Sequence, residues 1–260
     1  MIRAPVLVLA LLLAPAPAAP AAAQVPERIV AGLSQTQVAI TTNFAGSEIL
    51  VYGAVRRDAP PPGGGALQVI VTVAGPPVET VVRRRDRVAG IWVNNAAVTI
   101  DRAPSFYAIA TTRPLDRILR ATDDLRHRIS IPRTIRAVGI AAEAEGSPDF
   151  LEALIRLQTR RGNYVVDEGS VTLTDETLFR ADVALPANLV EGTYAVRIFL
   201  LRGGRVIDAV ERPIAVRKTG LERIFTQMAR NDPLAYGVLS LVLAVAAGWG
   251  ASAAFRLVRP

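Results

Sequence analysis

The chain has 260 residues, a formal net charge of +7 and no cysteine. The absence of cysteine excludes a disulfide-rich module, thiol chemistry and a lipid-modified N-terminal cysteine. Nearly all of the positive charge is arginine, with Lys218 as the single lysine, a bias that a GC-rich genome produces through codon usage. Attraction to anionic lipid headgroups or to an anionic ligand is the alternative interpretation of this charge.

Residues 1–23 have the three parts of a secretory signal peptide. Arg3 gives the positive start, residues 6–14 form a short apolar core, and Ala21-Ala22-Ala23 supplies the cleavage site. A helix over this core reaches about 14 Å, whereas a bilayer core is about 30 Å thick. We therefore expect cleavage and export, which argues against nucleic acid as a partner. The absence of Asn-x-Ser/Thr sequons favours a bacterial envelope over a eukaryotic cell surface.

Residues 24–112 have the pattern of a mainly β domain. Short β-branched and apolar runs alternate with Gly- and Pro-rich turns, which is typical of a sandwich or barrel. We expect a β-sandwich domain. Its expected strands include Glu48–Val55, Leu67–Ala74, Val78–Val82, Val88–Val93, Val98–Ile100 and Phe106–Thr111.

A cluster of arginines in this domain is the candidate interaction site. We expect its arginine run to form an inert, solvated turn, with the neighbouring aromatic residues in the sandwich core. The alternative is an interaction surface, in which guanidinium groups near aromatic and amide side chains bind an oxyanion or an acidic surface. The candidate residues are Arg83, Arg84, Arg85, Arg87, Trp92 and Arg113, and the neighbouring aromatic residues are Trp92, Phe106 and Tyr107.

Residues 113–162 interrupt the strands and are expected to be a helical insertion or linker. Leu115–Arg120 predicts a short helix. Ser147 and Pro148 have the residue types of a helix start, and the apolar spacing continues this second helix to Arg161.

Residues 163–218 return to strands and are expected to form a second Ig-like β unit. Tyr194 resembles the tyrosine corner of Ig-like sandwiches, and Gly203-Gly204 predicts a hairpin turn. About five strands are few for a complete sandwich, so whether 24–112 and 163–218 form one sandwich or two stays open. The expected strands are Tyr164–Asp167, Val171–Thr174, Leu178–Leu185, Thr193–Leu201 and Val206–Val216.

The sequence predicts no catalytic, cofactor or metal site. His127 is the only histidine and lies between two arginines, which favours surface exposure and excludes a histidine cluster. The acidic pairs Asp123-Asp124, Asp167-Glu168 and Asp175-Glu176 are interpreted as turn or cap residues. We expect a protein that is not an enzyme.

The C-terminal region predicts attachment to a membrane. Residues 219–232 form an amphipathic juxtamembrane helix, with a helix packed on the ectodomain as the alternative. Residues 233–257 are apolar up to Arg256 and predict one transmembrane helix, followed by a cytoplasmic tail at 258–260. Because the signal peptide exports everything before this span, we expect a single-pass protein of the inner membrane with a periplasmic ectodomain.

Small residues recur every four positions in the predicted span, which lets another helix approach closely. This stripe is the candidate packing face, and chance in an Ala-rich chain is the alternative. Its residues are Ser240, Ala244, Gly248 and Ser252.

Four stretches carry a resemblance to a known family. The first runs from Leu33-Ser34 through Val38-Ala39-Ile40 and Phe44-Ala45-Gly46 to Gly53-Ala54, and the second is Arg84–Asn94 with Pro104-Ser105-Phe106-Tyr107-Ala108 and Arg113-Pro114-Leu115. The third is Leu178-Phe179-Arg180 with Leu185-Pro186 and Gly192-Thr193-Tyr194, and the fourth is Gly220-Leu221-Glu222-Arg223 with Tyr236-Gly237 and Gly248-Trp249. In these stretches the chain resembles the alphaproteobacterial transmembrane protein family Alph_Pro_TM, over nearly the whole mature chain. The resemblance supplies no catalytic residues, and it implies a permease of the sulfite-exporter type as a transport partner.

We therefore expect a non-catalytic accessory subunit of a membrane complex, such as an anion permease, with the lipid bilayer and another membrane protein as its partners. The alternative is an envelope structural or adhesion module that binds a soluble protein or glycan through its β-sandwich.

Overall fold

The computed structural model describes residues 27–41, 44–58, 65–135, 147–218, 229 and 233–258. The predicted signal peptide and tail residues 259–260 lie outside these ranges, as does the predicted juxtamembrane helix at 219–232 except for Ala229.

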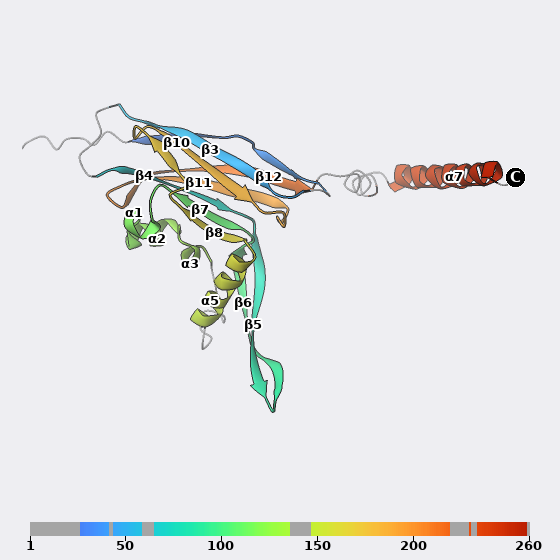
Figure 1. Ribbon diagram of the computed structural model, residues 1–260, viewed down its shortest axis with the longest axis horizontal. Helices are drawn as coiled ribbons and strands as arrows, with labels where there is room; N and C mark the ends of the chain where they lie inside the picture. Colours follow the sequence, from blue (N-terminus) through green and yellow to red (C-terminus); the bar gives the residue numbers. More distant parts are fainter. Residues whose placement is uncertain are drawn as a thin grey trace, which may run out of the picture.

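The body of the protein contains two stacked β-sheets, a helical layer below them and a long hairpin that leaves this layer (Figure 1). Sheet A has the strand order β1 (Arg28–Leu33), β3 (Ser47–Arg56), β10 (Leu178–Leu185), β9 (Thr172–Thr174). Sheet B has the order β2 (Gln37–Ile40), β12 (Arg205–Lys218), β11 (Gly192–Arg202), β4 (Leu67–Ala74), β7 (Tyr107–Thr111), β8 (Tyr164–Glu168). The mainly β fold class predicted from the sequence is confirmed.

Strands from the two ends of the sequence share both sheets. In sheet A, β10 pairs antiparallel with β3, and in sheet B, β11 pairs antiparallel with β4. The β2–β12 and β7–β8 pairs are parallel. Residues 27–56, 67–74 and 107–111 therefore build the same two layers as residues 164–218.

One hydrophobic core fills the space between the sheets. Along β3 the buried residues Ile49, Val51 and Val55 alternate with more exposed ones, as expected for a strand with one face on a core. Val71 of β4 and Val196 of β11 are fully buried against them from sheet B. Sheet A thus has one face in the core and one face in solvent.

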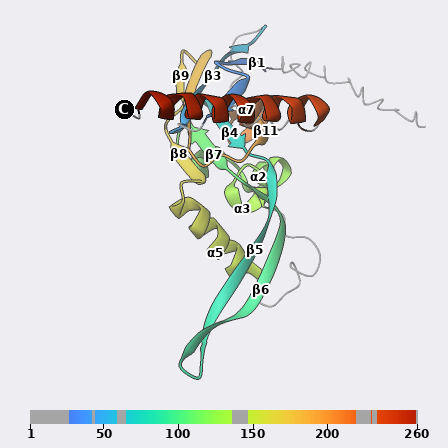
Figure 2. The same ribbon diagram turned by 90° about the vertical axis from the view of Figure 1, so that its right-hand side faces the viewer.

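A second core covers the other face of sheet B. Helices α1 (Leu115–Ile118), α2 (Ala121–His127), α3 (Ile131–Thr134) and α5 (Ser147–Arg160) lie beneath this sheet in Figures 1 and 2. Because β4 and β7 are buried on both faces, they read as continuous apolar runs without alternation. The helices predicted at 115–120 and from Ser147 to Arg161 are confirmed within two residues of their ends.

Side-chain hydrogen bonds hold the helical layer to sheet B. Arg197 of β11 donates to the carbonyl oxygens of His127 and Arg128 at 2.8 and 3.0 Å, which caps the end of α2. Asp124 accepts from the backbone N–H groups of Ile129 and Ser130 at 3.1 and 2.8 Å. The interpretation of Asp123-Asp124 as turn chemistry is confirmed at Asp124.

A buried ion cluster closes one end of the sandwich. Glu27 is 3% exposed at its side chain and accepts from Arg57 at 2.9 Å and from Arg202 at 2.9 and 3.0 Å. The two hydrogen bonds that Arg202 donates to the Glu27 carboxylate raise the pKa of Arg202. The cluster joins the residue before β1 to the residue after β3 and the end of β11.

Two turn features match the sequence. The Tyr194 hydroxyl donates to the Val190 carbonyl at 3.0 Å, which is the bond of a tyrosine corner. Gly203 and Gly204 have φ values of 58° and 82°, as a two-residue hairpin turn requires. The Ig-like assignment of the sandwich stays a prediction.

Helix α7 (Pro233–Val258) lies at the end of the chain and apart from the sheets (Figure 1). Its side chains are described at 233–234 and 236–252. Within the described residues, no helix is both long and apolar enough to cross a membrane. The transmembrane helix predicted at 233–257 stays a prediction.

Candidate functional site

The longest projection of the body is the hairpin formed by β5 (Pro77–Val88) and β6 (Ile91–Pro104). It leaves the helical layer as a twisted two-stranded ribbon in Figures 1 and 2. The prediction of three separate strands between 78 and 100 is wrong, because β5 and β6 each run without a break. Their connection is Ala89-Gly90, whose φ values of 49° and 86° fit a two-residue turn that matches the strand twist.

The base of the hairpin belongs to the second core. Val82 of β5 and Val98 and Ile100 of β6 are buried there with Phe150 of α5. The Tyr164 hydroxyl donates to the carbonyl of Pro104 at 2.9 Å and fixes the end of β6 to β8. Burial raises the pKa of Tyr164. The base is therefore held from two sides.

Three of the predicted site arginines share one face of the hairpin. Strand alternation puts Arg83, Arg85 and Arg87 on the same side of β5, and all three are exposed. Trp92 is the cross-strand partner of Arg87, and Asn94 is the partner of Arg85. We call these five residues the arginine face. The prediction that the arginine run forms a turn is wrong, because it lies within a strand.

Arg84 lies on the opposite face, toward α5. Its guanidinium carbon is 5.9 Å from the centre of the Phe150 ring, and its Nε is 3.5 Å from the Asp86 carboxylate. The Asp86 carboxylate also accepts from the Asn95 amide at 3.1 Å. Asn95 is the extra residue of a β-bulge at this point, which increases the twist of the ribbon. The charge of Asp86 is thus paired within the hairpin.

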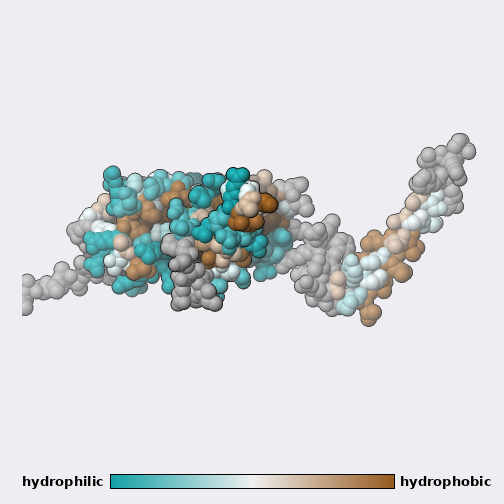
Figure 3. Space-filling view, turned by 90° about the horizontal axis from the view of Figure 1, so that it is seen from below, coloured by the Kyte–Doolittle hydropathy of each residue, from teal (hydrophilic) through white to brown (hydrophobic). Residues whose placement is uncertain are grey.

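The end of the hairpin exposes large apolar side chains on both faces. Val88 and Ile91 form the last cross-strand pair and are 52% and 68% exposed, and Val93 is exposed on the same face. Trp92 is 66% exposed on the arginine face, so the expectation of a core tryptophan is wrong, whereas Phe106 and Tyr107 are buried as expected. We call Val88, Ile91, Trp92 and Val93 the apolar tip. In Figure 3, brown apolar surface adjoins teal hydrophilic surface where the hairpin ends.

Arg113 is not part of this arrangement. The hairpin joins β7 at the Tyr107 end, where Tyr107 pairs with Ala74, and Arg113 follows the opposite end of β7 at Thr111. The structure therefore places five of the six predicted interaction residues on one hairpin, four of them on its arginine face, and separates the sixth. Val88, Ile91 and Val93 were missed as site residues, because Ala-Gly is not one of the residue pairs that signal a two-residue hairpin turn.

A cleft lies between β5 and α5 beside the hairpin base. It has a volume of about 430 Å³ and an open, mixed lining, with Arg83, Arg84 and Arg85 on one wall and Asp149, Glu152 and Arg156 on the other. These charges have both signs, so the cleft has no strong preference for a charged ligand.

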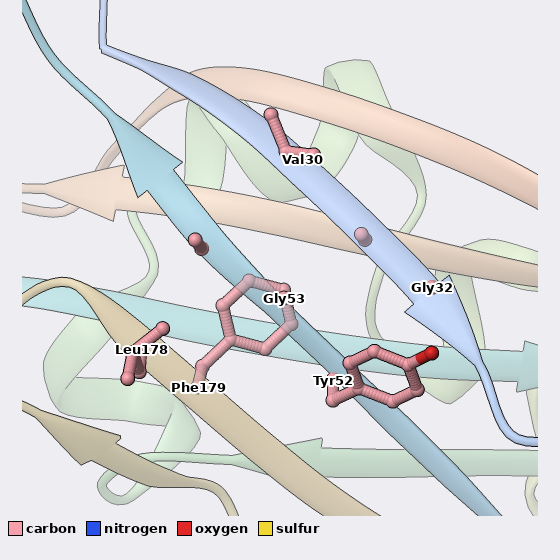
Figure 4. Close-up of a pocket in the computed structure, with 8 residues that line it drawn as sticks. Val30, Gly32, Tyr52, Gly53, Leu178 and Phe179 are labelled. Carbon is pink, nitrogen blue, oxygen red and sulfur yellow. The ribbon is translucent and has the colours of Figure 1, made fainter.

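A shallow apolar hollow lies on the solvent face of sheet A (Figure 4). Its volume is about 590 Å³. Tyr52 lies over Gly32, its cross-strand partner, and a Cβ at Gly32 would meet the Tyr52 ring at 2.9 Å. Val30 and Leu178, 58% and 57% exposed, flank the hollow from the neighbouring strands. The lining offers mainly apolar contact, with the Tyr52 hydroxyl as its polar side-chain group.

The described part of the chain contains no group of three or more His, Cys, Asp or Glu side chains placed to hold a metal ion. The predicted packing residues Ser240, Ala244, Gly248 and Ser252 all lie on α7. The described side chains of the hairpin can bind through guanidinium hydrogen bonds and apolar contact, and the hairpin is the candidate functional site.

Comparison with known proteins identifies one family. A family model described as "Putative transmembrane protein (Alph_Pro_TM)" matches residues 28–257. No curated protein matches the chain. Among solved structures, the sporulation control protein Spo0M of Bacillus subtilis is similar at a TM-score of 0.28 and 11% identity, over 79% of this chain. The chain spans 55% of that protein, and no argument rests on so distant a likeness.

Proposed function

The chain belongs to the Alph_Pro_TM family of transmembrane proteins, and on that premise we propose that it is a non-catalytic, single-pass accessory subunit of a membrane complex. In this proposal α7 crosses the bacterial inner membrane. The β-sandwich faces the periplasm, and the short tail after α7 lies in the cytoplasm.

The exposed apolar surface of α7 carries the proposal. Leu234, Leu241 and Val245 are 86%, 68% and 65% exposed, and Trp249 near the far end is 72% exposed. With the positions whose side chains are not described, the helix has 26 residues. At about 1.5 Å per residue its length exceeds the about 30 Å of a bilayer core. Side chains of this kind are stable only under an apolar cover, and a bilayer supplies it.

The orientation follows from the sequence. A cleaved signal at residues 1–23 exports the chain up to the next apolar segment, and that segment is α7. Arginines lie near both ends of the helix, with Arg230 before its start and Arg256 in its last turn, so charge alone favours neither orientation.

The partner in this proposal is another membrane protein that packs on the small-residue stripe of α7. Ser240, Ala244, Gly248 and Ser252 recur at four-residue spacing, and their small side chains let a second helix come close. An anion permease of the sulfite-exporter type is the partner that the family resemblance implies.

Photocrosslinking from two helix positions tests the proposal. A photoreactive residue at Gly248 is expected to capture one membrane protein in cells. The same residue at Ala246 is the matched control, because two residues at about 100° each place it across the helix. Labelling of lipid alone from both positions would contradict the accessory-subunit proposal.

A second candidate function is an envelope structural or adhesion module, and the apolar hollow on sheet A favours it. Here the chain without residues 219–260 retains a soluble protein or glycan in a pull-down. Val30→Asp together with Leu178→Asp removes that binding, and the same pair of changes leaves crosslinking from Gly248 intact.

A further inference from the structure

We propose that the β5–β6 hairpin is a membrane-binding arm, whose apolar tip enters the interface of a bilayer with anionic headgroups. The inference concerns a second membrane contact, separate from α7, and does not depend on whether α7 has a protein partner. It rests on the apolar tip, on the arginine face directly behind it, and on the projection of the ribbon away from the body (Figure 2).

The distribution of apolar side chains points to a bilayer as the occupant. Val88, Ile91 and Val93 lie on one face of the ribbon and Trp92 on the other, and all four are at least 40% exposed. A groove on a protein covers one face of a two-stranded ribbon. A bilayer surrounds an inserted tip on every side, so it covers both faces at once.

The arginines lie at the depth of the headgroups when the tip is inserted. At about 3.3 Å per residue along a strand, Arg87 and Arg85 lie roughly 3 and 10 Å behind Val88. Interfacial insertion reaches about 5–10 Å into the headgroup and acyl boundary. Arg87 and Arg85 then meet phosphate groups, which guanidinium groups bind bidentately. Arg83, farther back, adds attraction to an anionic surface.

The charge of the arm favours an anionic surface over a neutral one. Residues 83–93 contain four arginines and one acid, Asp86. Asp86 is engaged by Arg84 and Asn95 on the face turned toward α5. The arginine face itself therefore presents only positive charge to a surface that approaches it.

The backbone limits the depth of insertion. Among the described strands, β5 and β6 pair only with each other, so the outer edge of each strand has N–H and C=O groups without a strand partner. Such groups are costly in the hydrocarbon core. Trp92 suits the shallow position that remains, because its ring prefers the interface between headgroups and acyl chains.

The test uses the full-length chain held in phosphatidylcholine nanodiscs, to which vesicles with brominated acyl chains are added. Trp249→Phe leaves Trp92 as the only tryptophan, since the chain has 2. Vesicles that contain phosphatidylglycerol are expected to sediment the chain and to quench Trp92 fluorescence. Vesicles of phosphatidylcholine alone are expected to do neither.

Two triple variants separate the arginine face from net charge. R83Q/R85Q/R87Q is expected to lower vesicle affinity about a hundredfold, at roughly fivefold per surface arginine. R28Q/R56Q/R217Q removes the same charge from exposed positions on the sandwich and is expected to bind like the parent. Equal loss in both variants, or no sedimentation of the parent, would overturn the proposal. Sedimentation without quenching of Trp92 would overturn it too, because the arginine face then binds acidic surfaces without insertion.

Discussion

The sandwich and the β5–β6 hairpin are both built mainly from antiparallel strands, but apolar side chains are buried in the sandwich and exposed at the end of the hairpin. In the sandwich, Val51, Val71 and Val196 are fully buried between two sheets. In the distal hairpin, Val88, Ile91 and Trp92 have no second layer and are more than half exposed. Since burial is the main source of folding free energy, side chains of the apolar tip contribute little to folding. Contact with a surface outside the chain explains these exposed apolar side chains better than a role in folding does.

The ion pairs of the two regions give the largest expected contrast. Glu27→Ala leaves Arg57 and Arg202 without their carboxylate in a site where Glu27 is 3% exposed. We expect a loss of about 3–5 kcal/mol in the free energy of unfolding. Asp86→Ala removes a pair on the hairpin in which Asp86 is 38% exposed, and we expect a loss below about 1 kcal/mol. Urea unfolding followed by circular dichroism measures both, and equal losses would break the comparison.

A matched pair of isoleucines gives the next contrast. Ile198 of β11 is fully buried and Ile91 of the tip is 68% exposed. Ile198→Ala is expected to cost about 2–5 kcal/mol of folding free energy, whereas Ile91→Ala is expected to stay within about 0.5 kcal/mol. The same urea titrations apply. A loss above this range at Ile91 would mean that the tip packs on the body, contrary to its exposure in the structure.

The sandwich was predictable where burial leaves a clear pattern. Leu67–Ala74 and Leu178–Leu185 match their strands residue for residue, the first as a run buried on both faces and the second as an alternation. Helices α2 and α3 were not predicted, because they are short and are fixed by tertiary contacts such as the Arg197 cap.

The hairpin was missed for the opposite reason. Strand β5 continues through Arg83–Arg87, whereas a run of charged residues ordinarily indicates a solvated turn. Ala89 adopts a positive φ that the sequence does not signal, since alanine is uncommon there. Trp92 was expected in the core because most large aromatic residues are buried. Because the end of this ribbon is exposed on both faces, its sequence lacks the alternation of apolar and polar residues that indicates a half-buried strand.

Tyr164 of β8 bonds the sandwich to the end of β6 in the hairpin, and it gives a pH-dependent prediction. Burial raises the pKa of Tyr164 above its ordinary value of about 10. Its stabilising effect is therefore complete below about pH 10 and is lost as the pH rises through the raised folded-state pKa. Tyr164→Phe is expected to cost about 1 kcal/mol at neutral pH through the lost bond to Pro104. Above about pH 10 the gap between the variant and the parent is expected to narrow, as measured by thermal unfolding from pH 7 upward. A constant gap across that range would contradict the assignment of burial as the cause.

The smallest expected effect lies at the turn of the hairpin. Ala89 and Gly90 both have positive φ, and Asn-Gly is the preferred pair for such a turn. Ala89→Asn is expected to slow amide hydrogen exchange in residues 83–94 about two- to fivefold, since relief of αL strain at a non-glycine residue is about 0.5–1 kcal/mol. The melting temperature of the sandwich is expected to stay unchanged, because the distal hairpin opens on its own. A higher melting temperature would mean that hairpin and sandwich unfold as one cooperative unit. The exposed tip would then contribute to the folding free energy of the body, which would contradict the inference that its apolar side chains contribute little to folding.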